Sequence, residues 1–316
     1  MARNNDKNAQ LMTLIFRLLL KNPMAGIVAL ILAVGGYFFQ HKTKAPKTPA
    51  PVVKVEQKTV PDAAPTVVQQ DDTAVSFQGF PQAAQKEVQF LQNQAFSVGY
   101  SNQRGNPLWV VYKIHPIPVK LPPLERPTRF STDKRVQNQV KHNDYNKSGY
   151  DRGHSAPNFA ISALYGKQAQ LETFLMTNIT PQTPALNRKL WQRLEAAEIS
   201  YFTKLAPTIW VTTGTIFDNN IETLKTAPNV EIPDAFFKVY AMQKDGKIYL
   251  LAFIMPQAVK GNEPLDKYLV SVDKVEALTG LDFFAALDDS TENALEAAVV
   301  PAPWKVSEVA NLPSRY

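Results

Sequence analysis

The chain has 316 residues, of which 45% are hydrophobic, and this is enough apolar material for a sizeable folded core. Its formal net charge of +6 indicates a polyanionic partner only weakly, because residues 1–74 hold nine Lys or Arg and five Asp or Glu, whereas residues 75–316 hold twenty-five and twenty-three. The absence of cysteine excludes disulfides, thiolate metal sites and a cysteine nucleophile.

The N-terminal region consists of a short tail, residues 1–23, and an apolar run at 24–40 that contains no charged residue. At about 1.5 Å per residue, this run nearly crosses the hydrocarbon core of a bilayer. No small-residue cleavage site follows it, which favours a retained signal anchor over a cleaved signal peptide, and the proline-rich tail that follows argues against a core helix. The sequence therefore predicts a single-pass membrane protein whose folded domain is extracytoplasmic (periplasmic), with an organelle membrane as the alternative.

Residues 41–74 are rich in Pro, Ala and Lys and contain no aromatic side chain. Such a composition cannot bury enough surface to offset the entropy of ordering the chain. We expect an extended linker that holds a folded domain, residues 75–316, away from the bilayer.

The folded domain is predicted to be α+β with a mainly antiparallel sheet, because its strand and helix patterns do not alternate regularly. Alternating or continuous apolar patterns predict strands, joined in two places by hairpin turns, in residues 96–114 (two strands), 208–217, 235–243 and 247–256. Helices are predicted at residues 184–204 and 272–278.

Residues 148–160, SGYDRGHSAPNFA, contain His154, one of only four histidines in the chain. A lone histidine is more often structural than catalytic, but here Asp151 and Arg152 place both signs of charge beside it. Gly153 permits a close backbone approach that other residues do not. A guanidinium suits bidentate contact with phosphate, and a neutral imidazole can take a proton from water. The stretch therefore predicts a site for phosphodiester hydrolysis.

A second stretch, TNITPQTPALNRKLWQRLE at 177–195, places Asn187, Trp191 and Glu195 four residues apart, on one face of the predicted helix. An ordinary amphipathic helix explains the leucines of this segment, and Asn187 would then be a solvated residue of the first turn. A carboxamide oxygen is also a hard ligand suited to Mg²⁺, and a carboxylate further along the same face can hold water molecules around the ion.

Together the two stretches resemble the DNA/RNA non-specific endonuclease family, which includes endonuclease G and has a ββα-metal active site. The first family block matches Asp151 to Pro157. The second matches Asn178, Pro181, Gln182, Asn187, Trp191, Leu194 and Glu195. Two motifs in the correct order are far more specific than DRGH alone, and weaker similarity extends over roughly residues 90–285.

The resemblance implies a role for each matched residue. His154 would be the general base that activates water, and Asn187 the only direct protein ligand of one Mg²⁺ ion, with Mn²⁺ or another divalent ion as alternatives. Glu195 would organise metal-bound water, Asn178 would support the site, and Arg152 would bind the scissile phosphate.

Family members also place an upstream arginine on the phosphate, and Arg126 and Arg129 are both candidates. The implied partners are DNA and RNA, bound through the phosphate backbone, and the membrane, contacted through residues 24–40. The oligomeric state does not follow from the sequence, and a homodimer is one option. Thr215 stands where a proline is common in the family, which concerns a turn and leaves the chemistry intact.

The sequence thus predicts a membrane-anchored, Mg²⁺-dependent endonuclease that cleaves DNA and RNA without sequence preference. One alternative is a non-catalytic, membrane-anchored receptor for nucleic acid, which would be favoured only if the catalytic set had degenerated. Another is an envelope scaffold that uses the proline-rich linker, but it leaves both motifs unexplained.

Overall fold

The computed structural model describes residues 75–83, 87–117 and 123–315. The predicted membrane anchor at 24–40 and linker at 41–74 lie outside these residues. Within the described ranges, no helix has both the length and the hydrophobicity needed to cross a bilayer.

The core is a seven-stranded sheet in the order β12-β11-β10-β7-β4-β3-β2, in which every neighbouring pair is antiparallel. Its strands are β2 (Gln89–Gln92), β3 (Phe96–Ser101), β4 (Asn106–Ile114), β7 (Ile209–Ile216), β10 (Ala235–Lys244), β11 (Lys247–Pro256) and β12 (Leu269–Val270). The strands predicted from the sequence and the antiparallel arrangement are confirmed. At the β10–β11 turn, Asp245 and Gly246 both have positive φ, 51° and 72°, as this tight hairpin requires.

Three two-stranded sheets surround the core: β1 (Gln82–Ala83) with β13 (Leu281–Asp282), β5 (Asp151–His154) with β6 (Ile179–Gln182), and β8 (Thr223–Leu224) with β9 (Ala227–Glu231). The α-helices are α3 (Asn158–Thr173), α4 (Gln192–Ser200), α5 (Val272–Thr279), α6 (Asp289–Glu296) and α7 (Val306–Val309). Short 3-10 helices are η1 (His142–Tyr145), η2 (Met176–Asn178), η4 (Phe202–Lys204), η5 (Leu265–Tyr268) and η6 (Ala302–Trp304), and η3 (Leu186–Trp191) is a π-helix.

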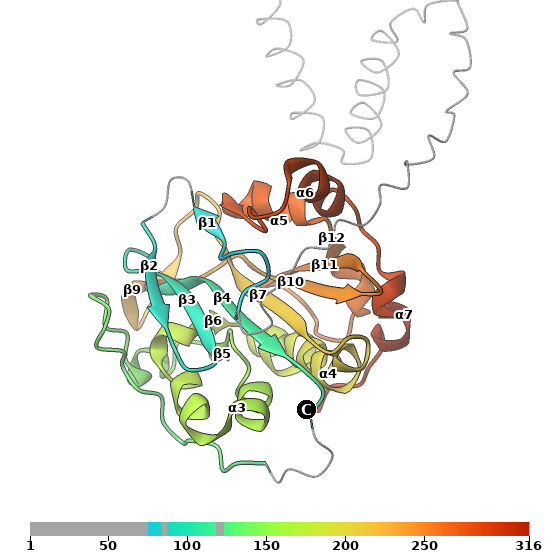
Figure 1. The fold of residues 1–316 in the computed structure, drawn as a ribbon. Helices are drawn as coiled ribbons and strands as arrows, with labels where there is room; N and C mark the ends of the chain where they lie inside the picture. Colours follow the sequence, from blue (N-terminus) through green and yellow to red (C-terminus); the bar gives the residue numbers. More distant parts are fainter. Residues whose placement is uncertain (1–74, 84–86, 118–122, 316) are drawn as a thin grey trace, which may run out of the picture. The chain divides into compact units, whose positions relative to one another are not determined.

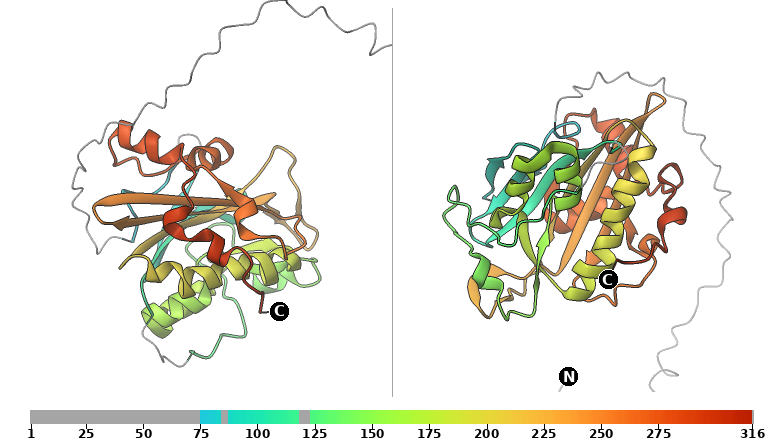
Figure 2. Two further views of the ribbon diagram at one scale, coloured as in Figure 1. Left: turned by 90° about the vertical axis from the view of Figure 1, so that its right-hand side faces the viewer. Right: turned by 90° about the horizontal axis from the view of Figure 1, so that it is seen from below.

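Helices cover both faces of the central sheet (Figures 1 and 2), with α3 and α4 on one face and α5 and α6 on the other. Alternate side chains of β4 divide between the two layers. Tyr112 packs in the cluster that contains Leu194 of α4, whereas Val111 packs in the cluster that contains Val275 of α5. Burial on both faces explains the unbroken apolar run at residues 107–112 of this strand, and each fully buried aliphatic side chain contributes about 1.5–3 kcal/mol.

The helix predicted at 184–204 is not one regular α-helix. It consists of the π-helical η3, then α4, then η4. The hydroxyl of Thr183 donates to the carbonyl oxygen of Gln257 at 2.7 Å, and its backbone carbonyl oxygen accepts from the amide of Asn187. The π-helical turn carries Asn187, and such turns are frequent at functional sites.

Candidate active site

Strand pairing brings the two sequence motifs together. β5 carries Asp151–His154 and pairs with β6, so that Gly153 lies opposite Thr180 and His154 opposite Ile179. A Cβ atom at Gly153 would lie 2.2 Å from Oε1 of Gln182, so only glycine allows this approach. The glycine of the first motif is therefore required by a glutamine of the second.

Asn178 stabilises the backbone that follows β5 through hydrogen bonds. Its side chain is fully buried, where Oδ1 accepts from the backbone amide of Ala156 at 2.8 Å and Nδ2 donates to the carbonyl oxygens of Ala156 and Thr173. Its carbonyl oxygen also accepts from the amide of Ser155. These bonds fix the backbone directly after His154, so Asn178 positions the histidine and does not line the cleft in front of it.

A cleft of about 580 Å³ lies over the β5 strand and the η3–α4 segment. Its lining comprises Arg126, Phe130, Asp151, Arg152, His154, Asn158, Phe159, Asn187, Arg188, Gln192, Glu195 and Arg315. Five of the seven site residues predicted from the sequence are in this set, and the two that are not are Asn178 and Arg129.

His154 lines the cleft and packs against two aromatic rings. It is 8% exposed, and the rings of Phe130 and Phe174 lie 5.4 and 5.0 Å from its own. Burial, together with the positive charge of Arg126, lowers the pKa of His154 to about 3, so the imidazole is neutral near pH 7. Its Nε2 is buried and has no hydrogen-bond partner among the described residues. The ring is therefore in the unprotonated form that a general base needs, and a nearby anion such as a phosphate group would raise its basicity.

Asn187 is oriented by Asp151. Its Nδ2 donates to Oδ2 of Asp151 at 3.0 Å, and Arg188 donates to both oxygens of the same carboxylate at 2.8 and 2.7 Å. Partial burial raises the pKa of Asp151, but the hydrogen bonds from Arg188 and Asn187 outweigh it, and the net pKa is lowered. Because an ionised carboxylate only accepts, Asn187 must turn its nitrogen to Asp151 and keep its oxygen for another partner. A free carboxamide oxygen fits a hard divalent cation.

Glu195, in α4, lines the same cleft as Asn187 in η3. Burial is the main cause that raises its pKa to about 7, with Lys238 opposing and Glu198 adding to the shift. Beneath it, Lys238 and Glu198 form an ion pair whose side chains are inaccessible to solvent, and the hydroxyls of Tyr112 and Tyr240 donate to Glu198 at 3.0 and 2.8 Å. This saturated network fixes α4 on the sheet and with it the position of Glu195.

The three predicted arginines differ in their hydrogen bonds and in their position relative to the cleft. Arg152 is held by the carbonyl oxygen of His142, at 3.0 and 2.6 Å, and by Oδ1 of Asn146 at 2.6 Å. Arg126 is exposed at the cleft, with its guanidinium 5.3 Å from the ring of Phe174. Arg129 is exposed but does not line the cleft. Of the two upstream candidates, the structure places only Arg126 beside His154.

Several cleft residues were not predicted from the sequence. Arg188 directly follows Asn187 in the sequence, and this adjacency was the one feature that could have indicated its place in the cleft. Arg315 lies more than a hundred residues beyond α4, yet its amide donates to Oε1 of Gln192 at 2.9 Å and its guanidinium lies 5.6 Å from the ring of Phe159. No local pattern in the sequence could have placed Arg315 at this cleft.

Comparisons with known proteins identify nucleases that this chain resembles. The chain is 31% identical over 232 residues to the mitochondrial nuclease of Saccharomyces cerevisiae, covering 65% of this chain and 68% of that protein. It is 29% identical over 208 residues to human mitochondrial endonuclease G, covering 62% and 69%. A crystal structure of the EndoG/EndoGI complex matches the fold with a TM-score of 0.60 at 24% identity, over 71% of this chain and 96% of the matched chain. The sequence profile of the DNA/RNA non-specific endonuclease family matches residues 72–290, so the chain belongs to this family of nucleases.

Proposed function

We propose that this protein hydrolyses phosphodiester bonds of DNA and RNA in the cleft over β5, with His154 as the general base. The observation that carries the proposal is that His154, in its unprotonated form, lines the same cleft as Arg152, Asn187 and Glu195. Two motifs that are distant in sequence thus supply a base, a phosphate-binding cation and oxygen ligands at one place.

In this mechanism, His154 accepts a proton from the attacking water. Its buried, apolar surroundings keep it neutral and available at neutral pH. Arg152, whose orientation is set by His142 and Asn146, binds the scissile phosphate, and Arg126 contributes a second positive charge.

Asn187 would hold a divalent ion, for which we propose Mg²⁺, through its carboxamide oxygen, and Glu195 would hold water molecules around it. When bound, the ion supplies positive charge to the phosphate and the leaving oxygen. The hydrogen bond to Asp151 leaves the carboxamide oxygen of Asn187 for another partner, which fits a cation, and a cation would hold Glu195 in its ionised form.

Cleavage without sequence preference follows from the kind of contacts that the cleft offers. Arg126, Arg152, Arg188 and Arg315 line it, and arginine contacts to phosphate carry no sequence information. We therefore expect similar cleavage of DNA and RNA with different base compositions.

We also propose that residues 24–40 anchor the protein in a membrane, with the nuclease domain on the extracytoplasmic side. The support is the uncharged apolar run itself. The similar nucleases of yeast and human are named mitochondrial, which suits an organelle membrane as the alternative. Carbonate extraction of membranes that contain the full chain distinguishes an inserted from a peripheral protein.

His154→Ala tests the proposed activity. The variant should bind nucleic acid normally and cleave plasmid DNA and RNA about 10²- to 10⁴-fold more slowly, because a general base contributes that much. His115→Ala, which removes another imidazole outside the cleft, is the matched control and should cleave normally. Near-normal turnover by His154→Ala in Mg²⁺ would exclude His154 as the base.

A further inference from the structure

A group of carboxylates lies on the face of the sheet opposite to the active site. Helix α5 contributes Asp273 and Glu276, and α6 ends in Glu296. One carboxylate oxygen of each lies within 4.8 Å of the other two. Helix α5 packs in the layer that contains Val275, whereas α4 packs in the other layer. The cluster therefore shares no residue with the nuclease cleft.

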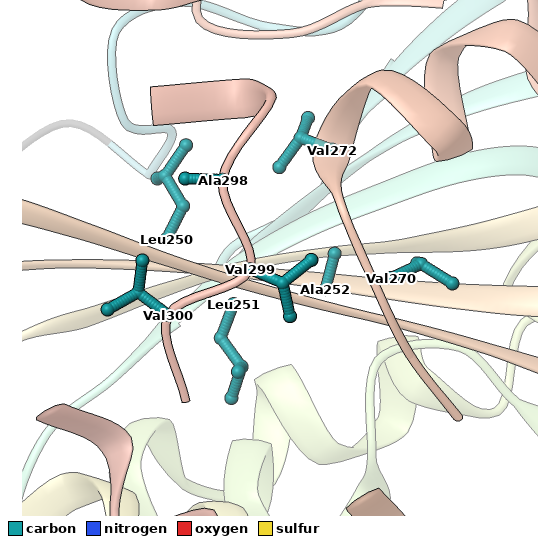
Figure 3. Close-up of a pocket in the computed structure, with 8 residues that line it drawn as sticks. All are labelled: Leu250, Leu251, Ala252, Val270, Val272, Ala298, Val299 and Val300. Atoms are coloured by element: carbon teal, nitrogen blue, oxygen red, sulfur yellow. The ribbon is translucent and has the colours of Figure 1, made fainter. Parts of the chain in front are cut away.

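Packing holds these carboxylates together. Figure 3 shows Val272, the first residue of α5, and Ala298, just after α6, around one apolar pocket together with Leu250 of β11. Asp273 directly follows Val272, and Glu296 lies two residues before Ala298. Because both segments pack on the same strand, their acidic side chains are held close even though like charges repel each other.

Of the three carboxylates, that of Glu296 has the greatest need of a hydrogen bond or a cation. It is 4% exposed, and its Oε1 is buried without a hydrogen-bond partner among the described residues. A buried carboxylate surrounded by other carboxylates is unfavourable unless a cation or a proton neutralises it.

We propose that Asp273, Glu276 and Glu296 bind a Ca²⁺ ion that stabilises the packing of α5 and α6 on the sheet. Ca²⁺ accepts six to eight oxygen ligands in flexible geometry, whereas Mg²⁺ binds through fewer carboxylates and keeps several waters. Zinc is less suited, because its protein ligands are mainly nitrogen and sulfur. Asp273 is exposed, so water can complete the coordination from its side. Oε1 of Glu276 accepts from the amide of Phe283 at 2.8 Å, which fixes the orientation of that carboxylate.

The test is thermal unfolding of the full chain carrying Asn187→Ala, a background chosen to remove the ligand of the nuclease site. Melting is measured at pH 8.5 in chelator, in Ca²⁺ and in Mg²⁺. At a Ca²⁺ concentration of about 100 times the Kd, ligand binding to the folded state should raise Tm by about 5–10 °C. Mg²⁺ at the same concentration should raise it clearly less.

Two substitutions in that background remove the proposed site. Glu296→Gln should unfold at a higher temperature than its parent in chelator, because it removes one buried negative charge, but it should gain nothing from Ca²⁺. Asp273→Asn, at an exposed position where folding is not at risk, should also lose most of the Ca²⁺ effect. Glu308→Gln is the matched control, since it neutralises an exposed carboxylate outside the cluster, and it should keep the full effect.

The proposal fails if Ca²⁺ leaves the parent unchanged, because a proton would then be sufficient to neutralise Glu296. It also fails if Ca²⁺ stabilises Glu296→Gln and Asp273→Asn as much as the parent, because the ion would then bind elsewhere. A Mg²⁺ effect equal to that of Ca²⁺ and lost in the same variants would overturn the assignment to calcium.

Discussion

Nδ2 of Asn187 donates a hydrogen bond of 3.0 Å to Oδ2 of Asp151, and this bond connects the two sequence motifs at the active site. Asp151 is in turn held by two hydrogen bonds from Arg188. The orientation of the Asn187 carboxamide is therefore set by the first residue of the DRGH motif. If Asn187 holds the proposed ion, Asp151 is the group that orients the ligand, and loss of such a group typically costs about 10- to 100-fold in metal affinity or activity.

Asp151→Ala should consequently weaken metal binding. We expect the Mg²⁺ concentration for half-maximal cleavage to rise by about 10- to 100-fold, the usual effect of losing such a partner, with much of the rate recovered at saturating Mg²⁺. The measurement is a Mg²⁺ titration of initial rates at saturating DNA. Arg188→Ala keeps the Asn187–Asp151 bond and should shift the titration less. An unchanged titration in Asp151→Ala would show that Asn187 needs no such support.

Asn187 and Glu195 should respond differently to substitution. Asn187→Ala removes the proposed direct ligand, so excess Mg²⁺ should restore only part of the lost activity. Glu195→Gln keeps the shape of the side chain and, because it acts through water, should lose less. Parallel Mg²⁺ titrations of the two variants compare them. A greater loss in Glu195→Gln would reverse the two assigned roles.

The central sheet could be predicted because its strands carry strong local patterns. Strand β4 shows the reason: Trp109 and Val111 pack in one layer and Val110 and Tyr112 in the other, so the run is apolar throughout. Helix α3 has no comparable signal, since Gly166, with φ of 81°, interrupts its regular conformation. The π-helical turn of η3 was also beyond prediction, because apolar spacing cannot distinguish a single wider turn from a regular one.

The residues of the candidate site also fall into two groups, those that local motifs predict and those whose position depends on long-range packing. His154 and Asn187 lie within specific motifs, so the sequence alone was sufficient to select them, and both line the cleft. The choice between Arg126 and Arg129 depends on how the segment before β5 folds over Phe174, which is a long-range packing outcome. Arg315 reaches the cleft only because the C-terminal segment returns to α4.

The two upstream arginines therefore give a direct comparison. Arg126→Ala should lower kcat/KM by about 10- to 100-fold, the range expected for a charged hydrogen bond to phosphate worth about 1.5–3 kcal/mol. Arg129→Ala removes the same charge a few residues away and should stay close to the parent. Steady-state kinetics on a short DNA duplex at fixed salt measures both variants. The opposite ranking would place Arg129 on the phosphate and contradict the geometry of the cleft.

The depressed pKa of His154 also makes folding stability depend on pH. In the unfolded chain a histidine titrates near 6.5, whereas burial and Arg126 hold the folded value at about 3. Between these values the unfolded state binds more protons, so His154 contributes stability above pH 6.5 that is lost progressively as the pH falls towards 3. At about 1.36 kcal/mol per pH unit, the loss at pH 4 is roughly 3 kcal/mol.

His154→Asn should remove this dependence. In chelator, the free energy of unfolding of the parent should fall relative to the variant as the pH is lowered from 7 to 4, by an amount on the order of 3 kcal/mol. Urea denaturation at both pH values measures the difference. The depressed pKa of Asp151 adds its own acid sensitivity, but it is present in both proteins and cancels in the comparison. Parallel curves would mean that His154 titrates normally in the folded protein, and the buried, neutral base proposed here would then be wrong.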